Sequence, residues 1–110
     1  MTMNQPAAGQ AADRCVWIEL TGPLQRAVGE DEVRLDWPSE DSLGEVLKAL
    51  LSSHPEAGDL LGDARSLELP DAGVPPGLLV IRGAIVLPPT LDTLIAPGDR
   101  LTLMPLISGG

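Results

Sequence analysis

The sequence predicts a small α+β domain, in which a mixed sheet of four to five strands is covered by one main helix. Short runs of alternating apolar and polar residues occur near both ends of the chain, a pattern typical of half-buried strands. One stretch in the middle repeats its apolar residues with helical spacing, which predicts an amphipathic helix. A single long helix among several strands is expected to pack across one face of one sheet.

The first two strands are expected at residues 15–20 and 32–37, where apolar and polar side chains alternate. Trp17 falls on the face opposite the other apolar residues of its strand. The connection over residues 24–31 is longer than a tight hairpin turn, so either a loose loop or a helical turn is expected there. The inward-facing residues of the two strands are Val16, Ile18, Leu20, Val33, Leu35 and Trp37.

The main helix is expected to begin at Ser42 and to end before Pro55. Ser42 and Glu45 form a capping box, in which the serine hydroxyl accepts from a first-turn N–H and the glutamate reaches back. His54 lies at the C-terminal end of the helix, where a cation is favoured. As a metal ligand or general base, His54 would have no partner ligands nearby in the sequence. The apolar stripe of the helix consists of Leu43, Val46, Leu47, Leu50 and Leu51.

Short elements and turns are expected after this helix. Leu60 and Leu61 predict a short turn or a second short helix. Residues 70–77 are rich in proline and glycine and predict a loop. The apolar run over residues 78–86 predicts one strand, or a pair of strands interrupted at Arg82–Gly83.

The C-terminal segment predicts a tight turn, a strand and a slender tail. Residues 96–99, Ala-Pro-Gly-Asp, have the sequence of a type II turn. A last strand is expected to begin at Arg100, and Pro105 should end it or place it at an edge because proline lacks a ladder donor. The chain then finishes in Gly109–Gly110, which could enter a slot too narrow for other residues. The alternative is a frayed tail with no role.

The last fourteen residues, PGDRLTLMPLISGG, resemble the C-terminus of the ThiS/MoaD sulfur carriers, the small ubiquitin-like proteins of thiamine and molybdopterin biosynthesis. That family ends in a Gly-Asp turn, an apolar strand, a proline, a few small or apolar residues and Gly-Gly, and each part occurs here in order. The resemblance covers residues 15–110 and implies a ubiquitin-like β-grasp fold. The chain departs from the family in its N-terminal extension and in a longer loop at residues 70–77. The expected organisation is a disordered leader at 1–13, a β-grasp domain at 14–107 and a flexible tail at 108–110.

The resemblance implies a carrier cycle at Gly110. An E1-like enzyme would use ATP to adenylate the Gly110 carboxylate, and a persulfide sulfur donor would displace AMP to leave a C-terminal thiocarboxylate. A downstream sulfur-accepting synthase subunit would then take the sulfur. Chain length and residues 55–61 favour a molybdopterin-type pathway over thiamine, cysteine or secondary-metabolite pathways. The residues expected to contact the walls of the partner's channel are Gly109, Ser108, Ile107 and Leu106.

Two other functions remain open at the level of sequence. The protein could be a ubiquitin-like modifier whose Gly110 is joined to a target lysine, or a β-grasp interaction module in which Gly-Gly is incidental. Trp17 and Met104 mark a possible docking face, since tryptophan is favoured at interface hot spots. The alternative is that a loop or the leader partly covers the Trp17 ring. Lys48 is the only lysine, so chains built through the protein's own lysines have almost no sites.

The composition argues against several classes of protein. A net charge of −9 opposes binding to nucleic acid or to an anionic membrane. Cys15 is the only cysteine, so neither an intrachain disulfide nor a Cys/His metal site is expected, which fits a reducing cytoplasm. No apolar run reaches the roughly 18 residues of a membrane span. The sequence also lacks a phosphate-binding loop, CxxC, HExxH and a Ser/His constellation. We therefore expect a cytoplasmic carrier without catalytic residues or a bound cofactor.

Overall fold

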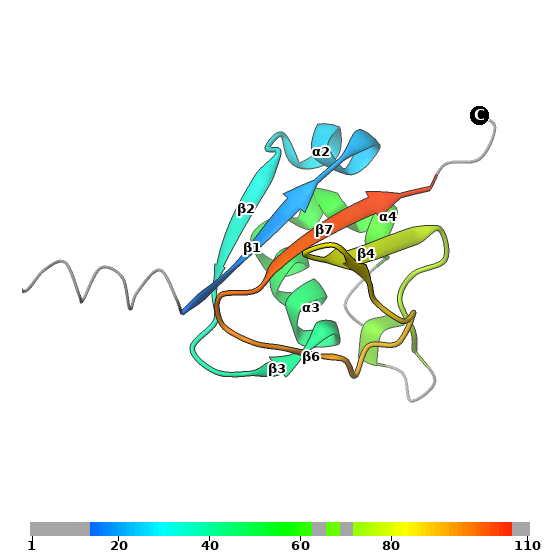
Figure 1. The fold of residues 1–110 in the computed structure, drawn as a ribbon. Coiled ribbons are helices and arrows are strands. Elements are labelled where there is room, and N and C mark those ends of the chain that lie inside the picture. The colour runs from blue at the N-terminus through cyan, green and yellow to red at the C-terminus, as the bar shows by residue number, and fades with distance from the viewer. Residues whose placement is uncertain (1–13, 63–65, 69–71, 107–110) are drawn as a thin grey trace, which may run out of the picture.

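The computed structural model describes residues 14–62, 66–68 and 72–106. Within them lies a five-stranded sheet with helices on one side of it (Figure 1). The expected leader at residues 1–13 and the expected tail at residues 108–110 are outside the described residues. The domain limits therefore stay a prediction, whereas the sheet and its helix can be compared with the sequence pattern directly.

The main sheet has the strand order β2-β1-β7-β4-β5. Strand β1 (Cys15–Leu20) pairs antiparallel with β2 (Glu32–Asp36) and parallel with β7 (Arg100–Pro105). Strand β4 (Leu78–Arg82) pairs antiparallel with both β7 and β5 (Ile85–Val86). The mixed sheet with one main helix confirms the predicted α+β class.

The last strand lies at the centre of the sheet, although it comes from the C-terminal end of the chain (Figure 1). In β7, Leu101 and Leu103 are fully buried and lie opposite Ile18 and Leu20 of β1. Apolar side chains that alternate along a strand cover one sheet face, and here that face meets the helix. Because β7 lies between β1 and β4, it is hydrogen-bonded on both edges. This pairing fixes where the chain leaves the domain.

Helix α3 (Leu43–Ser53) crosses the inner face of the sheet. The Ser42 hydroxyl accepts a hydrogen bond from the Glu45 N–H at 3.3 Å, so the predicted cap is present. The apolar stripe is buried along its whole length, which confirms the predicted helix face. Burial of this stripe is what stabilises a helix of eleven residues, because isolated helices of this length are marginal in water.

Helix α2 (Gly22–Val28) fills the connection that the sequence left as a loop or a helical turn. Pro23 stands in its first turn, where a missing N–H costs nothing, and Gly29 ends it with a φ of 87°. The Thr21 hydroxyl donates to the Leu103 carbonyl at 3.1 Å and so joins the start of α2 to the centre of β7.

A second, two-stranded ladder lies at the bottom of the domain in the view of Figure 1. Strands β3 (Asp41–Ser42) and β6 (Leu94–Ile95) pair antiparallel beside the start of α3. The buried indole N–H of Trp37 donates to the Ile95 carbonyl at 2.9 Å, and so ties the end of β2 to this ladder. Trp37 itself follows β2, which ends one residue earlier than the alternation predicts.

The remaining elements are short. A 3₁₀ turn η1 (Pro55–Ala57) and helix α4 (Gly58–Leu61) follow α3, which confirms a short helix at Leu60 and Leu61. A second 3₁₀ turn, η2, spans Ser66–Glu68. The apolar run over residues 78–86 forms the hairpin β4–β5, with Gly83 in the turn at a φ of 61°.

Candidate functional site

The candidate site begins where β7 ends and the chain leaves the sheet. Pro105 lies opposite Leu78 of β4, and the Leu106 N–H donates to the Gly77 carbonyl at 2.5 Å. The Leu106 side chain is 56% exposed. The other residues expected in the partner's channel, Ile107, Ser108 and Gly109, and the reacting Gly110 lie outside the described residues. The described structure thus places the base of the tail at the surface, at the end of a central strand.

The turn before β7 has the geometry that its sequence predicts. Gly98 has a φ of 94°, and the Asp99 N–H donates to the Ala96 carbonyl at 3.1 Å. The Asp99 carboxylate accepts from the Ala96 N–H at 2.9 Å and closes the turn from the other side. The Gly98 N–H donates to the Cys15 carbonyl at 2.8 Å. These bonds set the point at which β7 begins, and hence the register in which it reaches its end.

Arg82, at the end of β4, adds a side-chain clamp to the turn before β7. Its guanidinium donates to the Leu94 carbonyl at 2.9 Å and lies 3.5 Å from the Asp99 carboxylate. The clamp joins β4, β6 and the turn before β7, three segments that are separate in the sequence. The clamp therefore fixes the start of β7, and the pairing of β7 with β1 and β4 places the base of the tail at the end of a central strand.

Trp17 lies on the outer face of the sheet, the face opposite α3, as the alternation predicts. Its ring is half-buried between two guanidinium groups, with Arg34 at 6.0 Å and Arg100 at 5.5 Å from the ring centroid. Both distances fall within the range of cation–π attraction. Arg100 also donates to Glu32 at 3.1 Å. The ring is thus partly covered by arginines of the neighbouring strands, which the sequence did not predict.

Met104 shares the outer face with Trp17 but lies at the other end of β7. Trp17 is opposite Arg100 in the parallel pairing, and four residues along a strand correspond to about 13 Å. The structure therefore places both predicted docking residues on one face without joining them into one cluster. Trp17 lies near the start of β7, whereas Met104 lies two residues from the base of the tail.

An apolar patch surrounds Met104 instead. Leu79 lies directly opposite Met104, and Ile81 lies opposite Val86 on the same face. Val86 is 55% exposed, and the other three side chains are half-buried. Sequence reasoning named Met104 but missed Leu79, Ile81 and Val86, although every position of residues 78–81 is apolar, a signal that both faces of a strand are covered. The apolar patch consists of Leu79, Ile81, Val86 and Met104.

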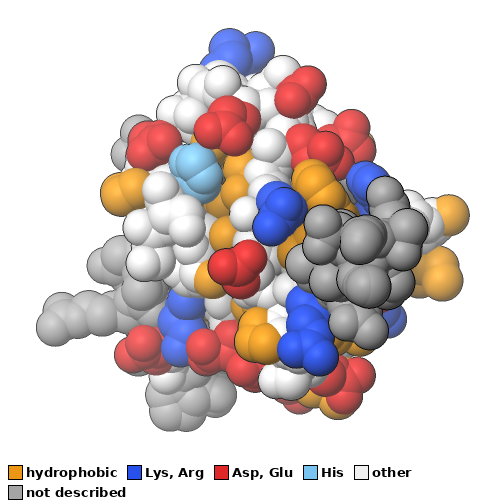
Figure 2. Space-filling view, turned by 90° about the vertical axis from the view of Figure 1, so that its left-hand side faces the viewer, with side chains coloured by type: hydrophobic (Ala, Val, Ile, Leu, Met, Phe, Trp, Pro, Cys, Tyr) orange, Lys and Arg blue, Asp and Glu red, His pale blue; other side chains and the backbone are white. Residues whose placement is uncertain are grey.

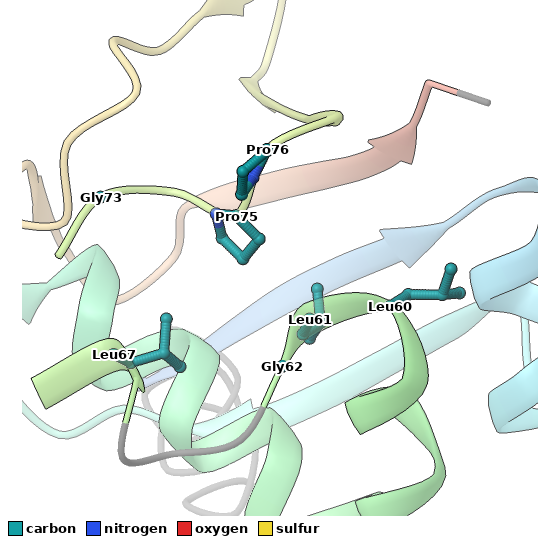
Figure 3. A pocket seen from close by; sticks show the side chains of 7 residues that line it. All are labelled: Leu60, Leu61, Gly62, Leu67, Gly73, Pro75 and Pro76. Atoms are coloured by element: carbon teal, nitrogen blue, oxygen red, sulfur yellow. The ribbon is translucent and has the colours of Figure 1, made fainter. Parts of the chain in front are cut away.

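A pocket of about 420 Å³ lies between α4, η2 and the loop before β4 (Figure 3). Leucines of α4 and η2 form one wall, and prolines of the loop form the other. None of its described lining residues can exchange a proton, so these walls offer shape and apolar surface but no acid–base chemistry. The residues that line the pocket are Leu60, Leu61, Gly62, Leu67, Gly73, Pro75 and Pro76.

Charged side chains of both signs are mixed on the face of the molecule opposite the end of β7. Figure 2 shows acidic groups scattered across one face, with basic groups between them. Among the described residues, no three His, Cys, Asp or Glu side chains gather in a group that could hold a metal ion. His54 lies 3.6 Å from Glu56. No helix in the described part of the chain has the length and apolar character needed to cross a membrane.

Comparison with known proteins places this geometry in a family. The model of the ThiS family matches residues 18–110. The crystal structure of SAMP1 from Haloferax volcanii is 28% identical over 87% of this chain and 99% of that chain, with a TM-score of 0.66. No match is found among curated proteins.

Two more distant structures show the same fold. Small archaeal modifier protein 1 from Methanosarcina acetivorans is 21% identical over 87% of this chain and 96% of that chain, with a TM-score of 0.68. Urm1 from Trypanosoma brucei is 17% identical over 88% and 96%, with a TM-score of 0.65. These likenesses confirm the predicted ubiquitin-like β-grasp.

The family match also covers the segment that carries the predicted chemistry. It includes the whole of β7 and continues through Gly109 and Gly110. Proteins of this kind are small carriers and not enzymes, in agreement with the expectation from the sequence motifs. The chain belongs to the ThiS family.

Proposed function

We propose that the protein is a sulfur carrier, whose Gly110 carboxylate is adenylated by an E1-like enzyme and then converted to a thiocarboxylate. The observation that carries the proposal is the ThiS family match, which extends through Gly110. The fold supports it, because β7 is held at the centre of the sheet and ends at the surface. A tail attached there can extend into a partner while the domain stays folded.

The proposed chemistry takes place at the carboxylate of Gly110. ATP transfers AMP to one carboxylate oxygen and releases pyrophosphate, which turns a poor acyl group into a reactive one. The terminal sulfur of a persulfide attacks the acyl carbon, AMP leaves, and a thiol then reduces the S–S bond to give the thiocarboxylate. Its ionised sulfur is the nucleophile. The carrier supplies Gly110 as the reacting group and Gly109, Ser108, Ile107 and Leu106 as the part that lies in the partner's channel.

The proposed sulfur acceptor is a synthase subunit of the molybdopterin type, in preference to thiamine, cysteine or secondary-metabolite pathways. Chain length and the segment at residues 55–61 support this choice. The segment forms η1 and α4, which pack beside α3. Because the cycle uses ATP and a persulfide, the proposal also places the protein in the cytoplasm.

A second function, conjugation to other proteins, is favoured by the name of one relative. The structure that is 28% identical is SAMP1, and a 26% identical structure from the same organism is described as small archaeal modifier protein 1. In that role, Gly110 would form an amide bond with a lysine of a target protein. Both functions share the adenylation step and differ in the nucleophile that follows it.

Mass spectrometry of the protein from its native cells tests the two functions. Trypsin cleaves after Arg100 and releases residues 101–110 as the C-terminal peptide. A carrier is expected to show this peptide with a gain of about 16 Da, from replacement of one oxygen by sulfur. A modifier is expected to leave the same ten residues attached to lysines of other proteins. If neither product is found in cells with an active pathway, both functions are contradicted.

The apolar patch is proposed as the docking face for the activating enzyme. It adjoins the base of the tail, so an enzyme seated there would have the tail within reach. Methionine is enriched at protein interfaces, and a few residues near the centre of an interface carry most of the binding energy. Trp17 is less suited to this role, because Arg34 and Arg100 already flank its ring and it lies at the far end of β7.

The substitution Met104→Asp is expected to lower kcat/KM for adenylation by about tenfold or more, because an unpaired carboxylate in an apolar interface is costly. The rate of ATP–pyrophosphate exchange with the activating enzyme measures this effect. Leu94→Asp is the matched control, since Leu94 is 54% exposed in β6, away from the patch. Equal losses for the two folded variants would contradict docking at the patch.

A further inference from the structure

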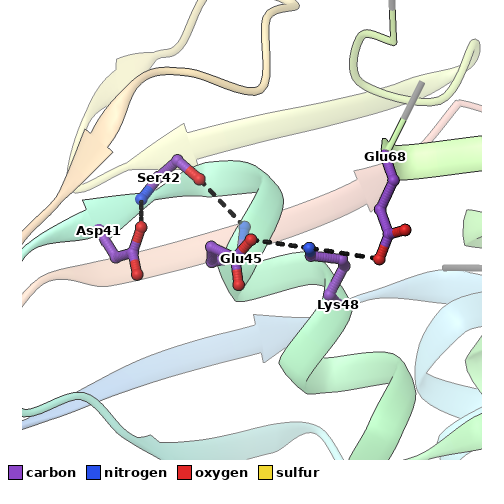
Figure 4. Close-up of polar contacts among 5 residues, drawn as sticks. All are labelled: Asp41, Ser42, Glu45, Lys48 and Glu68. Atoms are coloured by element: carbon purple, nitrogen blue, oxygen red, sulfur yellow. Dashed lines mark hydrogen bonds and ion pairs between the residues drawn. The ribbon is translucent and has the colours of Figure 1, made fainter. Parts of the chain in front are cut away.

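Lys48 is the only lysine of the chain, and its ammonium group is held by two carboxylates. Figure 4 shows Lys48 projecting from α3 between Glu45 of the same helix and Glu68 of η2. The Nζ atom lies 2.7 Å from Oε2 of Glu45 and 3.5 Å from Oε2 of Glu68. Only 26% of the Lys48 side chain is exposed. The amine is therefore paired with carboxylates from two elements, and these two glutamates are 23 residues apart in the sequence.

An amine matters to this protein because an activated C-terminus reacts with amines. In aminolysis, the neutral nitrogen attacks the acyl carbon, an amide bond forms, the bond to the leaving group breaks, and the nitrogen loses a proton. A protonated amine has no free electron pair and does not attack. The lysine of a second copy would be a side reaction for a carrier and a route to chains for a modifier.

We propose that the cluster of Lys48, Glu45 and Glu68 protects the activated protein from acylating the lysine of another copy. The biological meaning of this protection rests on the proposed function, since it presupposes that Gly110 becomes activated. Its chemical basis is the geometry of the cluster. Two carboxylates within 2.7 and 3.5 Å of Nζ stabilise the charged ammonium, the form of the amine that cannot attack an acyl carbon.

The electrostatics act in the same direction as the geometry. The hydrogen bond with Glu45, together with the negative charges of Glu45 and Glu68, raises the pKa of Lys48 above its ordinary value. A raised pKa leaves a smaller fraction of neutral amine at any pH below it. Glu45 from α3 and Glu68 from η2 are the charged groups that face this ammonium among the described residues. Removal of both carboxylates is therefore expected to lower the pKa of Lys48, so that its rate of acylation begins to rise at a lower pH.

The test uses full-length protein that carries a chemically installed thioester at Gly110, so that neither ATP nor an activating enzyme is needed. It is mixed with isotope-labelled protein whose Gly110 is a free carboxylate. Mass spectrometry follows acylation of Lys48 and, separately, of the N-terminal amine. In the unaltered protein, Lys48 is expected to react about tenfold more slowly than Nα-acetyl-lysine methylamide at equal concentration. The double variant E45Q/E68Q is expected to react at least about threefold faster than the unaltered protein.

Glu40→Gln is the matched control, because it removes a carboxylate that does not contact Lys48. This variant should leave the rate at Lys48 unchanged, and acylation of the N-terminal amine should be equal in all variants. The proposal is overturned if Lys48 of the unaltered protein reacts as fast as the reference amine. It is also overturned if the double variant reacts no faster, or if Glu40→Gln has the same effect. Absence of the thiocarboxylate in cells would contradict the proposed function while leaving this result intact.

Discussion

Deletion of Gly109 and Gly110 is expected to abolish activation of the protein, with ATP–pyrophosphate exchange falling to the level seen without carrier. The deletion places the carboxylate two residues closer to the domain, on Ser108, so that it no longer reaches the site of adenylation. In the proposed mechanism, a Cβ at that position would also obstruct the partner's channel if it admits only glycine. The measurement is isotope exchange between pyrophosphate and ATP with the E1-like enzyme of the same cell.

Addition of one alanine after Gly110 provides the complementary test. It retains both glycines but moves the carboxylate outwards, and it is also expected to prevent exchange. Both variants should keep the unfolding midpoint of the unaltered protein, because the described core ends at Leu103. Exchange at the normal rate by either variant, without proteolytic trimming, would contradict activation at Gly110.

The substitution Leu47→Ala is expected to lower the free energy of unfolding by about 2–5 kcal/mol. Leu47 is completely buried in the apolar stripe of α3, where the helix packs on the sheet. Removal of its side chain loses apolar burial and leaves a cavity that close-packed neighbours fill only partly. Small domains are stable by about 5–15 kcal/mol, so the loss is a large share of the total. Urea unfolding, followed by circular dichroism, measures it.

Leu94→Ala is the matched control for this prediction. The same atoms are removed from a side chain that is 54% exposed, so the expected change is within about 0.5 kcal/mol. Comparison of the two variants shows how much of the loss in unfolding free energy comes from burial of the side chain, because the Leu→Ala change is the same in both. A loss below about 1 kcal/mol at Leu47 would contradict its central place in the core.

Local patterns predicted most of the regular structure. The alternation at residues 15–20, the cap at Ser42 and the turn at residues 96–99 all depend on neighbours within a few positions. Local sequence is enough to predict such features, because strand faces, helix caps and tight turns are set by adjacent residues. The connection at residues 24–31 was less certain. Its helix is fixed in part by the bond from Thr21 to Leu103, a residue more than eighty positions away.

The candidate site was predicted less completely. Gly110 and its neighbours were chosen from the sequence, and their roles are still proposals. Alternation placed Trp17 on the outer face, where the structure also has Met104, but alternation gives only a face and not the distance between two residues along the sheet. The apolar patch around Met104 depends on the pairing of β4 with β7, which brings Leu79 and Met104 together from distant parts of the chain.

By itself the sequence determined the class of fold, the main helix and the turn before β7, because each depends on the order of side chains along a short stretch. Only the tertiary structure decided that β7 lies between β1 and β4, and that Glu68 joins Glu45 at Lys48. Those contacts connect residues far apart in the chain. They form because one buried face must be covered by another, and no local spacing specifies which segments will meet.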